Sequence, residues 1–187
     1  MRIISGIHRG RRIETIKNKT LRPTMGMTRE AIFNILTHGD YADLLPNAIV
    51  LDLFCGAASF SMEALSRGAQ HVVCMDISND HLAVARYNIG HINETQKATF
   101  IRADSANPPY ATKSCNLVFL DPPYNANLAS TALIKAIDRG WLSDDAVIVV
   151  ETEERETFEA PADFIETNNR TYGKSRVRIL KRIKNGQ

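Results

Sequence analysis

Apolar and polar positions along most of this chain alternate between two kinds of segment. Some are short apolar runs of the kind that form buried strands, and others carry apolar residues every three or four positions, as amphipathic helices do. The pattern predicts strands at 48–54, 71–76, 98–104, 115–121, 146–152 and 176–183, and helices at 59–68, 79–92 and 127–140. Strands that alternate with helices predict βαβ crossovers and a mostly parallel sheet in an α/β fold.

The N-terminal region follows a different pattern. Two short β-type runs within residues 1–16 turn at glycines and predict a small hairpin or a curled ribbon. An apolar helical stripe follows, and we expect Thr28 to cap this helix and Gly39 to end it. The chain is therefore expected to form an N-terminal ribbon and helix over residues 1–40 and one compact domain over residues 41–187.

The composition indicates a folded protein of the cytoplasm. Of 187 residues, 44% are hydrophobic and 24% are charged, which excludes a wholly disordered chain and fits one well-formed core. No apolar run approaches the roughly 20 residues of a membrane helix, and residues 1–13 lack an apolar signal core. Cys55, Cys74 and Cys115 stand apart within apolar runs, so we expect buried, reduced thiols and no metal site.

Charge is distributed unevenly, although the net charge is only +2. Residues 1–35 hold eight Lys and Arg against two acidic residues, and residues 170–187 hold seven against none. The part of the chain between them therefore has a net charge of −11. If the two basic ends lie close together, they form one face suited to phosphates; otherwise they are two solvated basic tails.

Four acidic residues stand at or near the carboxyl ends of successive predicted strands. They are Asp52, Asp76, Asp104 and Asp121. A single aspartate at such a position usually caps a helix or forms a turn. In an open α/β sheet, however, ligands bind beyond the carboxyl ends of the strands, where the strand order reverses. Four aspartates in sequence order favour one shared crevice over four unrelated turns.

The segment LDLFCGAASF at 51–60 is typical of the turn that begins a nucleotide-type cofactor site. Gly56 allows a sharp turn and a close ligand, and the following helix directs free N–H groups toward it. Asp76, 24 residues after Asp52, is placed to hold ribose hydroxyls. Because Ala58 stands where a dinucleotide site needs its second glycine, the segment favours an adenosyl cofactor that carries an amino acid over NAD.

The segment VFLDPPYN at 118–125 is more specific. Two consecutive prolines end the strand in a rigid turn, which leaves the Asp121 carboxylate and the Pro122 carbonyl as two acceptors facing the crevice. An exocyclic amine of a nucleobase has two N–H donors to match them, and Tyr124 offers a face on which the base stacks. The similar NPPY at 107–110 does not follow a comparable buried run and is predicted to be a loop.

Several segments resemble those of one family in order and spacing. These are MRIISGIHRGRRI, RPT, REAIFNIL, LDLFCG, EALSRGA and DPPY. They resemble the bacterial small-subunit rRNA guanine-N2 methyltransferases of the RsmD type, which belong to the class I S-adenosylmethionine-dependent methyltransferases. The resemblance covers residues 1–125 and continues more weakly through YGKSRVRIL. It implies a Rossmann-like, mostly parallel seven-stranded sheet with helices on both faces and a small N-terminal β-ribbon.

The resemblance also implies roles for the matching residues. Those implied to bind S-adenosyl-L-methionine are Thr24, Asp52, Phe54, Gly56, Asp76, Ile77, Asp104 and Ser105. Asp52 and Gly56 would contact the methionine part, Asp76 would hold the ribose, and Asp104 with Ser105 would contact the adenine. Those implied to hold the target guanine amine are Asp121, Pro122, Pro123 and Tyr124. Those implied to bind rRNA are Arg2, His8, Arg9, Arg11, Arg12 and Arg22.

The chain departs from the family pattern at three places. It has GAA at 56–58 where the family usually has GSG, and aspartate at position 76 where glutamate is common. The stretch MGM at 25–27 stands where an acidic and a basic residue usually follow RPT. We expect the small Ala58 to preserve the pocket. The resemblance also implies that Thr24, Arg29 and Glu30 lie close to the cofactor mouth.

The resulting expectation is methylation of the exocyclic N2 amine of a guanine in 16S rRNA, with S-adenosyl-L-homocysteine as product. Two alternatives stay open. One is an adenine-N6 DNA methyltransferase, because DPPY suits both amines; the other is a catalytically decayed RNA-binding module, which Ala58 supports. The missing second glycine and DPPY argue against a dehydrogenase. We expect a monomer whose partner is 16S rRNA or the small ribosomal subunit, with no membrane and no metal.

Overall fold

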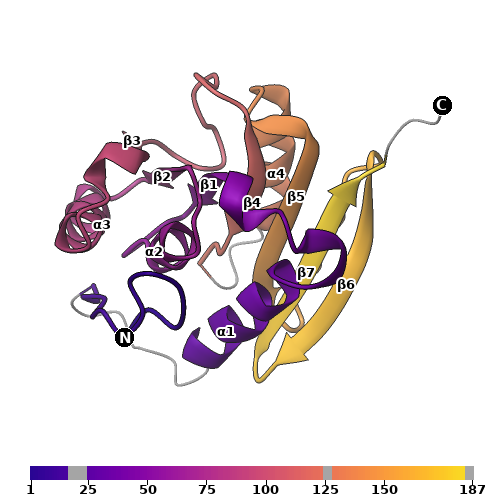
Figure 1. The fold of residues 1–187 in the computed structure, drawn as a ribbon. Helices are drawn as coiled ribbons and strands as arrows, with labels where there is room; N and C mark the ends of the chain where they lie inside the picture. Colours follow the sequence, from indigo (N-terminus) through magenta and orange to yellow (C-terminus); the bar gives the residue numbers. More distant parts are fainter. Residues whose placement is uncertain (17–24, 124–127, 184–187) are drawn as a thin grey trace.

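The computed structural model describes residues 1–16, 25–123 and 128–183, and within them one seven-stranded sheet in the order β3-β2-β1-β4-β5-β7-β6 (Figure 1). The strands are β1 (Ile49–Leu53), β2 (His71–Asp76), β3 (Ala98–Arg102), β4 (Cys115–Leu120), β5 (Leu142–Glu153), β6 (Phe164–Tyr172) and β7 (Ser175–Arg182). The helices are α1 (Met25–Leu36), α2 (Ser59–Ser66), α3 (Asn79–His91) and α4 (Leu128–Asp138), with short 3₁₀ turns η1 (Gly39–Tyr41), η2 (Leu45–Asn47) and η3 (Thr95–Lys97). This arrangement confirms the predicted Rossmann-like α/β fold.

The strand order reverses between β1 and β4. The chain passes from β1 to β2 and β3 on one side, then crosses back to β4 and β5, and all these neighbours pair in parallel. β7 is antiparallel to β5, and β6 is antiparallel to β7 at the outer edge. The carboxyl ends of β1, β2 and β4 therefore lie side by side at the switch point, where open α/β sheets bind their ligands.

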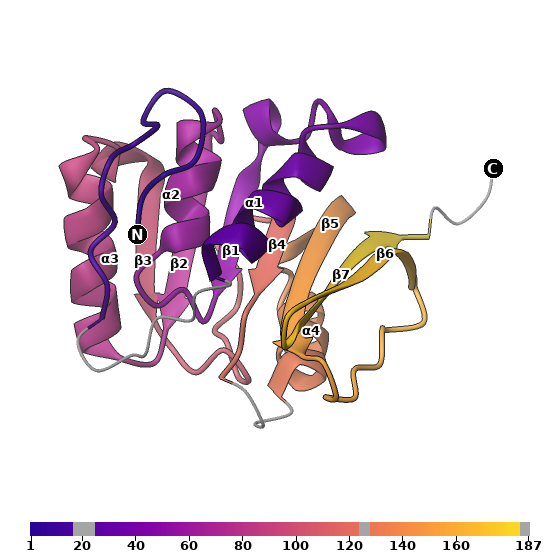
Figure 2. The same cartoon turned by 90° about the horizontal axis from the view of Figure 1, so that it is seen from below.

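Helices cover both faces of the sheet (Figures 1 and 2). On one face, α1, α2 and α3 pack against the strands, with Phe33 and Leu65 in the same buried cluster as Val50. On the other face, α4 places Leu133 in a cluster with Val118. Strands that are buried on both faces read as continuous apolar runs, which explains why the sequence pattern located the central strands.

Two smaller predictions, for the cysteines and for NPPY, are confirmed by the described residues. Cys55, Cys74 and Cys115 are buried and free, as expected. NPPY is a loop, and its Pro109 carbonyl accepts a 2.8 Å hydrogen bond from Nε1 of the fully buried Trp141. No helix in the described ranges has the length and apolar character needed to span a bilayer. The same ranges contain no group of three or more His, Cys, Asp or Glu side chains placed to bind a metal.

Several predicted boundaries are wrong, and one strand was missed. The first helix ends at Leu36 and not at Gly39, and β5 begins at Leu142 and not at Ala146. α1 begins at Met25, so Thr28 lies inside the helix, buried and with no hydrogen-bond partner for its hydroxyl among the described residues, and it does not cap the helix. β3 ends at Arg102, short of Asp104. The missed strand is β6, in which Phe164 alone is buried, so the strand has no apolar alternation to reveal it.

The N-terminal ribbon and the C-terminal strands lie toward opposite ends of the sheet, whereas α1, the other described part of the first basic stretch, packs beside β7. The N-terminal ribbon packs beside α2 and α3, whereas β7 and β6 form the far edge of the sheet, and both views separate them (Figures 1 and 2). The ribbon and the C-terminal strands therefore do not form the single basic face that the charge pattern allowed.

The N-terminal segment is a curled ribbon, as predicted. Its two arms meet in an antiparallel bridge between Arg2 and Arg12. At its turn, Gly6 has a φ of 84°, and a Cβ there would lie 1.8 Å from the Ser66 carbonyl oxygen. The next residue, Ile7, donates its backbone N–H to that same carbonyl at 2.8 Å. Only glycine fits a turn held this close to the end of α2.

Candidate cofactor and substrate site

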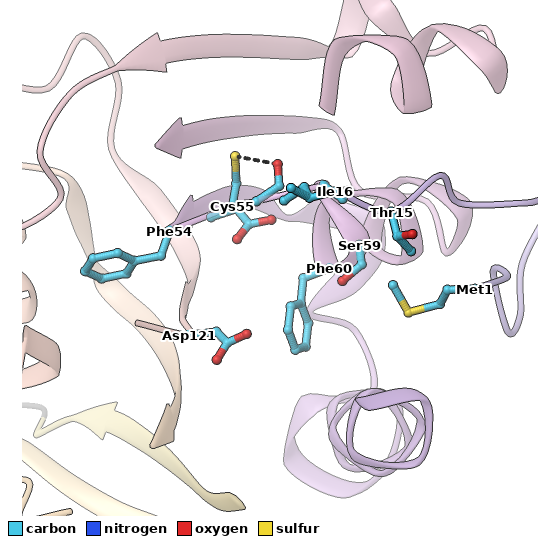
Figure 3. A pocket seen from close by; sticks show the side chains of 11 residues that line it. Met1, Thr15, Ile16, Phe54, Cys55, Ser59, Phe60 and Asp121 are labelled. Carbon is cyan, nitrogen blue, oxygen red and sulfur yellow. Dashed lines mark hydrogen bonds between the residues drawn. The ribbon is translucent and has the colours of Figure 1, made fainter. Parts of the chain in front are cut away.

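A pocket opens at the switch point between β1 and β4 (Figure 3). Its lining residues are Met1, Thr15, Ile16, Asp52, Phe54, Cys55, Gly56, Ala57, Ser59, Phe60 and Asp121. The space between its lining atoms, including the open mouth, is about 530 Å³. The pocket brings together four predicted site residues, and it adds Met1, Thr15, Ile16 and Phe60, which sequence reasoning did not place there.

The turn after β1 is built from left-handed backbone. Phe54, Gly56 and Ala58 have φ values of 64°, 53° and 59°. The Ala58 N–H donates to the Cys55 carbonyl at 2.8 Å and closes the turn just before α2 begins. A residue other than glycine costs on the order of 1 kcal/mol in this conformation, and such strain clusters at functional sites.

Asp76, the last residue of β2, holds this turn in place. Its Oδ2 accepts the Gly56 N–H at 2.9 Å, and its Oδ1 accepts the Ser78 N–H at 2.9 Å. Nδ1 of His81 lies 3.1 Å from both carboxylate oxygens. The sequence carried no recognisable signal for the His81 contact. These bonds make Asp76 a support of the turn after β1, and its contact with a ribose stays a prediction.

The other predicted cofactor residues after β2 and β3 do not line the pocket. Ile77 is 65% exposed, Asp104 is exposed and accepts a backbone N–H of its own turn at 2.9 Å, and Ser105 is buried. The Ala103 N–H donates to the Asp76 carbonyl at 3.2 Å, which brings this loop to the end of β2. Contact of these residues with the adenosyl group stays a prediction.

The chain leaves β4 at Asp121, whose carboxylate faces the pocket in Figure 3. Pro122 is buried and Pro123 is exposed. Tyr124 lies outside the described residues, and so do Arg22 and Thr24, so their predicted roles have no structural counterpart here.

Asp52 is a buried carboxylate beside this pocket. Its side chain accepts the Ser61 hydroxyl at 2.6 Å and the Ser61 N–H at 3.3 Å, both at Oδ2. Burial raises the pKa of Asp52 from 3.8 to about 7 against the lowering effect of the Ser61 bonds, and the charges of Asp121 and Asp76 raise it further. Two carboxyl groups, those of Asp52 and Asp121, line the pocket, and an acidic lining favours a cationic ligand.

The raised pKa makes the free energy of unfolding depend on pH. Between pH 3.8 and about pH 7, the folded state keeps a proton on Asp52 that the unfolded state has released. The contribution of Asp52 to the free energy of unfolding is therefore greatest below the unfolded pKa and is lost as pH rises through the folded pKa. Between the two pKa values, the loss is up to about 1.4 kcal/mol per pH unit.

We expect Asp52→Asn to remove this dependence. The measurement is the difference in urea unfolding free energy between the two proteins from about pH 5 to about pH 8, with the variant gaining relative stability as pH rises. A difference that stays constant across this range would contradict the raised pKa.

Aromatic side chains from three elements form one side of the pocket and its support. Phe60 of α2 stacks on Phe119 of β4 with ring centroids 4.7 Å apart, and Phe33 of α1 lies 5.6 Å from Phe119. The Arg67 guanidinium lies 5.0 Å from the centre of the Phe33 ring. Phe119 and Asp121 are two residues apart at the end of an extended strand, so they share one side of the chain. The aromatic cluster thus fixes the backbone that carries Asp121.

A buried ionic cluster fastens the ribbon to α1 and α2. Glu63 of α2 is fully buried, and its carboxylate accepts the backbone N–H groups of residues 4–5 at 2.8 and 3.0 Å. Nε of Arg67 lies 3.0 Å from this carboxylate and Nε of Arg29 3.7 Å. Burial lowers the pKa of Arg29, whose Nη2 also donates to the Arg2 carbonyl at 2.6 Å. Arg29 therefore anchors the ribbon, and its Nη1 lies 2.8 Å from Sδ of Met1, a lining residue, although Arg29 itself does not line the pocket.

The predicted RNA-binding residues of the ribbon differ in exposure. Arg2, Arg9, Arg11 and Arg12 are exposed, whereas His8 is half-buried. Nε2 of His8 lies 2.9 Å from Oε1 of Glu94, so His8 ties the ribbon to the segment after α3. Arg12 pairs with Glu14 at 2.9 Å. The ribbon thus presents arginines to solvent on its outer side, while Thr15 and Ile16 form part of the pocket wall.

The strand order, the left-handed turn after β1 and the acidic crevice at the switch point define a class I methyltransferase fold. The family model for conserved hypothetical protein 95 matches residues 1–181, and the chain belongs to this family, the RsmD family. Ribosomal RNA small subunit methyltransferase D of Escherichia coli is 32% identical, and the match covers 100% of this chain and 92% of that relative.

Two solved structures are similar as well. The Escherichia coli protein yhhF has a TM-score of 0.82 at 28% identity, with 97% of each chain covered. The magnesium protoporphyrin IX methyltransferase ChlM of Synechocystis, solved with bound S-adenosylmethionine, has a TM-score of 0.64 at 19% identity, covering 83% of this chain and 78% of that one. At that identity the second likeness concerns the fold.

Proposed function

We propose that this protein transfers the methyl group of S-adenosylmethionine to the exocyclic N2 amine of a guanine in small-subunit rRNA. The observation that carries the proposal is one pocket shared by the Gly56 turn, Asp52, Asp121 and the end of a basic ribbon. The name of the Escherichia coli relative supports small-subunit rRNA as the substrate class. The bound ligand of the ChlM structure supports the cofactor.

The residues of the pocket fit S-adenosylmethionine. The turn at Gly56 has no Cβ to block a close ligand, and the carboxyl group of Asp52 suits the cationic amino group in the methionine part of the cofactor. Phe54 and Phe60 offer apolar surface on either side. When bound, the cofactor supplies a methyl group that is already activated by the sulfonium, and the protein has mainly to position the amine.

Asp121 and Pro122 hold the target amine in this proposal. The Asp121 carboxylate and the Pro122 carbonyl accept the two N–H donors, which fixes the nitrogen and directs its lone pair toward the methyl group. Asp121 then takes the proton that the amine loses and passes it to water. The target base has to leave its stack to reach this depth, so we expect it to be flipped out of the RNA.

The outer arginines of the ribbon provide the RNA contacts. Arg9 and Arg11 are exposed beside the turn of the ribbon and suit phosphate oxygens. Because the ribbon continues from these arginines to Thr15 and Ile16 in the pocket wall, RNA held on its outer side lies next to the reaction site.

Cofactor binding and substrate choice can be tested separately. Calorimetry with S-adenosylmethionine is expected to show binding at a single site, and failure of the folded protein to bind would support the decayed module. Methyl transfer is then measured on small subunits that lack the modification and on duplex DNA, with mass spectrometry of the nucleosides. N2-methylguanine in rRNA is the expected product, and N6-methyladenine in DNA would overturn the substrate assignment.

Ala58→Gly is expected to change little. The substitution relieves left-handed strain of about 1 kcal/mol, but it removes a fully buried methyl group worth a similar amount. The free energy of unfolding should therefore stay within about 1 kcal/mol of the wild type. Affinity for S-adenosylhomocysteine, measured by calorimetry, should stay within a few-fold. A large gain in affinity would show that Ala58 impairs the site.

A further inference from the structure

Asn88 is a buried polar side chain in the last turn of α3, 1% exposed. Its Oδ1 accepts the Glu14 N–H at 2.9 Å, and its Nδ2 donates to the Glu14 carbonyl at 2.9 Å. The same Nδ2 donates to the Ala57 carbonyl at 2.9 Å. A carboxamide has two N–H donors, and in Asn88 both are used.

These three bonds join two segments that the site needs but that lie far apart in the sequence. Glu14 is directly followed by Thr15 and Ile16, which form part of the pocket wall. Ala57 directly follows Gly56 in the cofactor turn. α3 itself is held rigidly, because Ala85 and Ile89 are fully buried in the core.

The other hydrogen bonds of the ribbon connect it to parts of the protein outside the cofactor turn. The backbone N–H groups of residues 4–5 bond to Glu63, Ile7 bonds to Ser66, and His8 bonds to Glu94. These contacts fix the outer part of the ribbon to α2 and to the segment after α3. Asn88 instead fixes the ribbon at Glu14, next to the pocket wall. Its Nδ2, which donates to the Glu14 carbonyl, also donates to the Ala57 carbonyl in the cofactor turn.

We propose that Asn88 is a positioning residue that couples the RNA-binding ribbon to the cofactor turn, so that RNA and cofactor each strengthen the binding of the other. The inference rests on the proposed function. RNA that orders the ribbon also orders Glu14, and through Asn88 it orders the Ala57 carbonyl and the turn that receives the methionine part. Because coupling between two binding equilibria is reciprocal, the cofactor must favour RNA by the same factor.

The coupling is measured as the ratio of the affinities for S-adenosylhomocysteine with and without an RNA fragment that contains the unmodified target. For the wild type we expect the fragment to raise the affinity by about fivefold or more. Asn88→Ala should reduce this factor to near one, and Asn88→Ser serves the same purpose if the alanine variant folds poorly. Ile92→Ala is the matched control: Ile92 is a buried α3 neighbour without a side-chain bond to ribbon or turn, so this variant should keep the wild-type factor while losing stability.

Two results would overturn the inference. One is a wild type that binds both ligands without coupling, and the other is an Asn88→Ala variant that retains the wild-type factor. A wild type that binds neither ligand would instead refute the proposed function. In that case, hydrogen exchange of the ligand-free proteins still tests whether Asn88 links the ribbon to the cofactor turn. Amides at 11–16 and at 55–58 should both exchange faster in Asn88→Ala than in Ile92→Ala. Exchange that is the same in the two variants would overturn this link.

Discussion

Asp121→Ala is expected to lower the rate of methyl transfer by on the order of 10²-fold or more while leaving affinity for S-adenosylhomocysteine within a few-fold. Asp121 lines the pocket directly after β4, on a backbone segment that the Phe60–Phe119 stack supports. In the proposed reaction its carboxylate holds the amine and takes its proton, so its loss acts on the transfer step more than on the cofactor. Single-turnover rates with undermethylated subunits measure the first quantity, and calorimetry measures the second.

The control for this variant is Asp138→Ala. Asp138 ends α4 and pairs with Lys135 at 3.7 Å on the surface, away from the lining of the pocket. It should keep the wild-type rate. An Asp121→Ala protein with a wild-type single-turnover rate would contradict the role assigned to this carboxylate, and equal losses of rate and cofactor affinity would place it among the cofactor contacts instead.

Glu63→Ala is expected to lower the free energy of unfolding by about 3–5 kcal/mol. The substitution leaves the buried Arg29 guanidinium without its carboxylate and two N–H groups of the ribbon without their acceptor. A buried charge that loses its partner keeps the full cost of its desolvation. Urea unfolding monitored by circular dichroism gives the value, and faster amide exchange at residues 1–16 would show that the ribbon has come loose.

Asp144→Ala is the matched control for a broken ion pair. Asp144 is fully exposed and lies 3.0 Å from Arg182. Surface pairs of this kind contribute little because water screens both charges, so we expect no measurable change. A loss for Glu63→Ala below about 1 kcal/mol would mean that the ribbon does not depend on the buried cluster.

The parts of the fold that could be predicted from the sequence are those specified by local residue patterns, without reference to distant segments. The central strands are continuous apolar runs because helices cover both faces, and the Gly56 and DPPY turns are recognisable from local chemistry. β6 could not be found in this way, because a polar edge strand is specified by pairing with β7 and not by its own pattern.

The site was predicted only in part for the same physical reason. Asp52, Gly56 and Asp121 were found because each stands at a strand end, but the wall formed by Thr15 and Ile16 depends on how the ribbon folds back. Asn88, Glu63 and His81 were missed because their partners are 20 or more residues distant or lie on another element; Asn88, for example, bonds across 74 positions of the chain. Glu63 belongs to a predicted amphipathic helix, in which an acidic residue is normally expected to face solvent. Its burial is explained only by the ribbon, which packs against α2 and bonds to the Glu63 carboxylate.

β6 carries a further consequence for how copies of this chain meet one another. An edge strand offers unpaired N–H and C=O groups that can recruit a second sheet. In β6 the pairing shifts register between Glu166 and Asn168, and its exposed positions include Glu166 and Arg170. An interrupted, charged edge is a poor template for strand addition, so we expect this side of the sheet to resist pairing with the edge of a second copy.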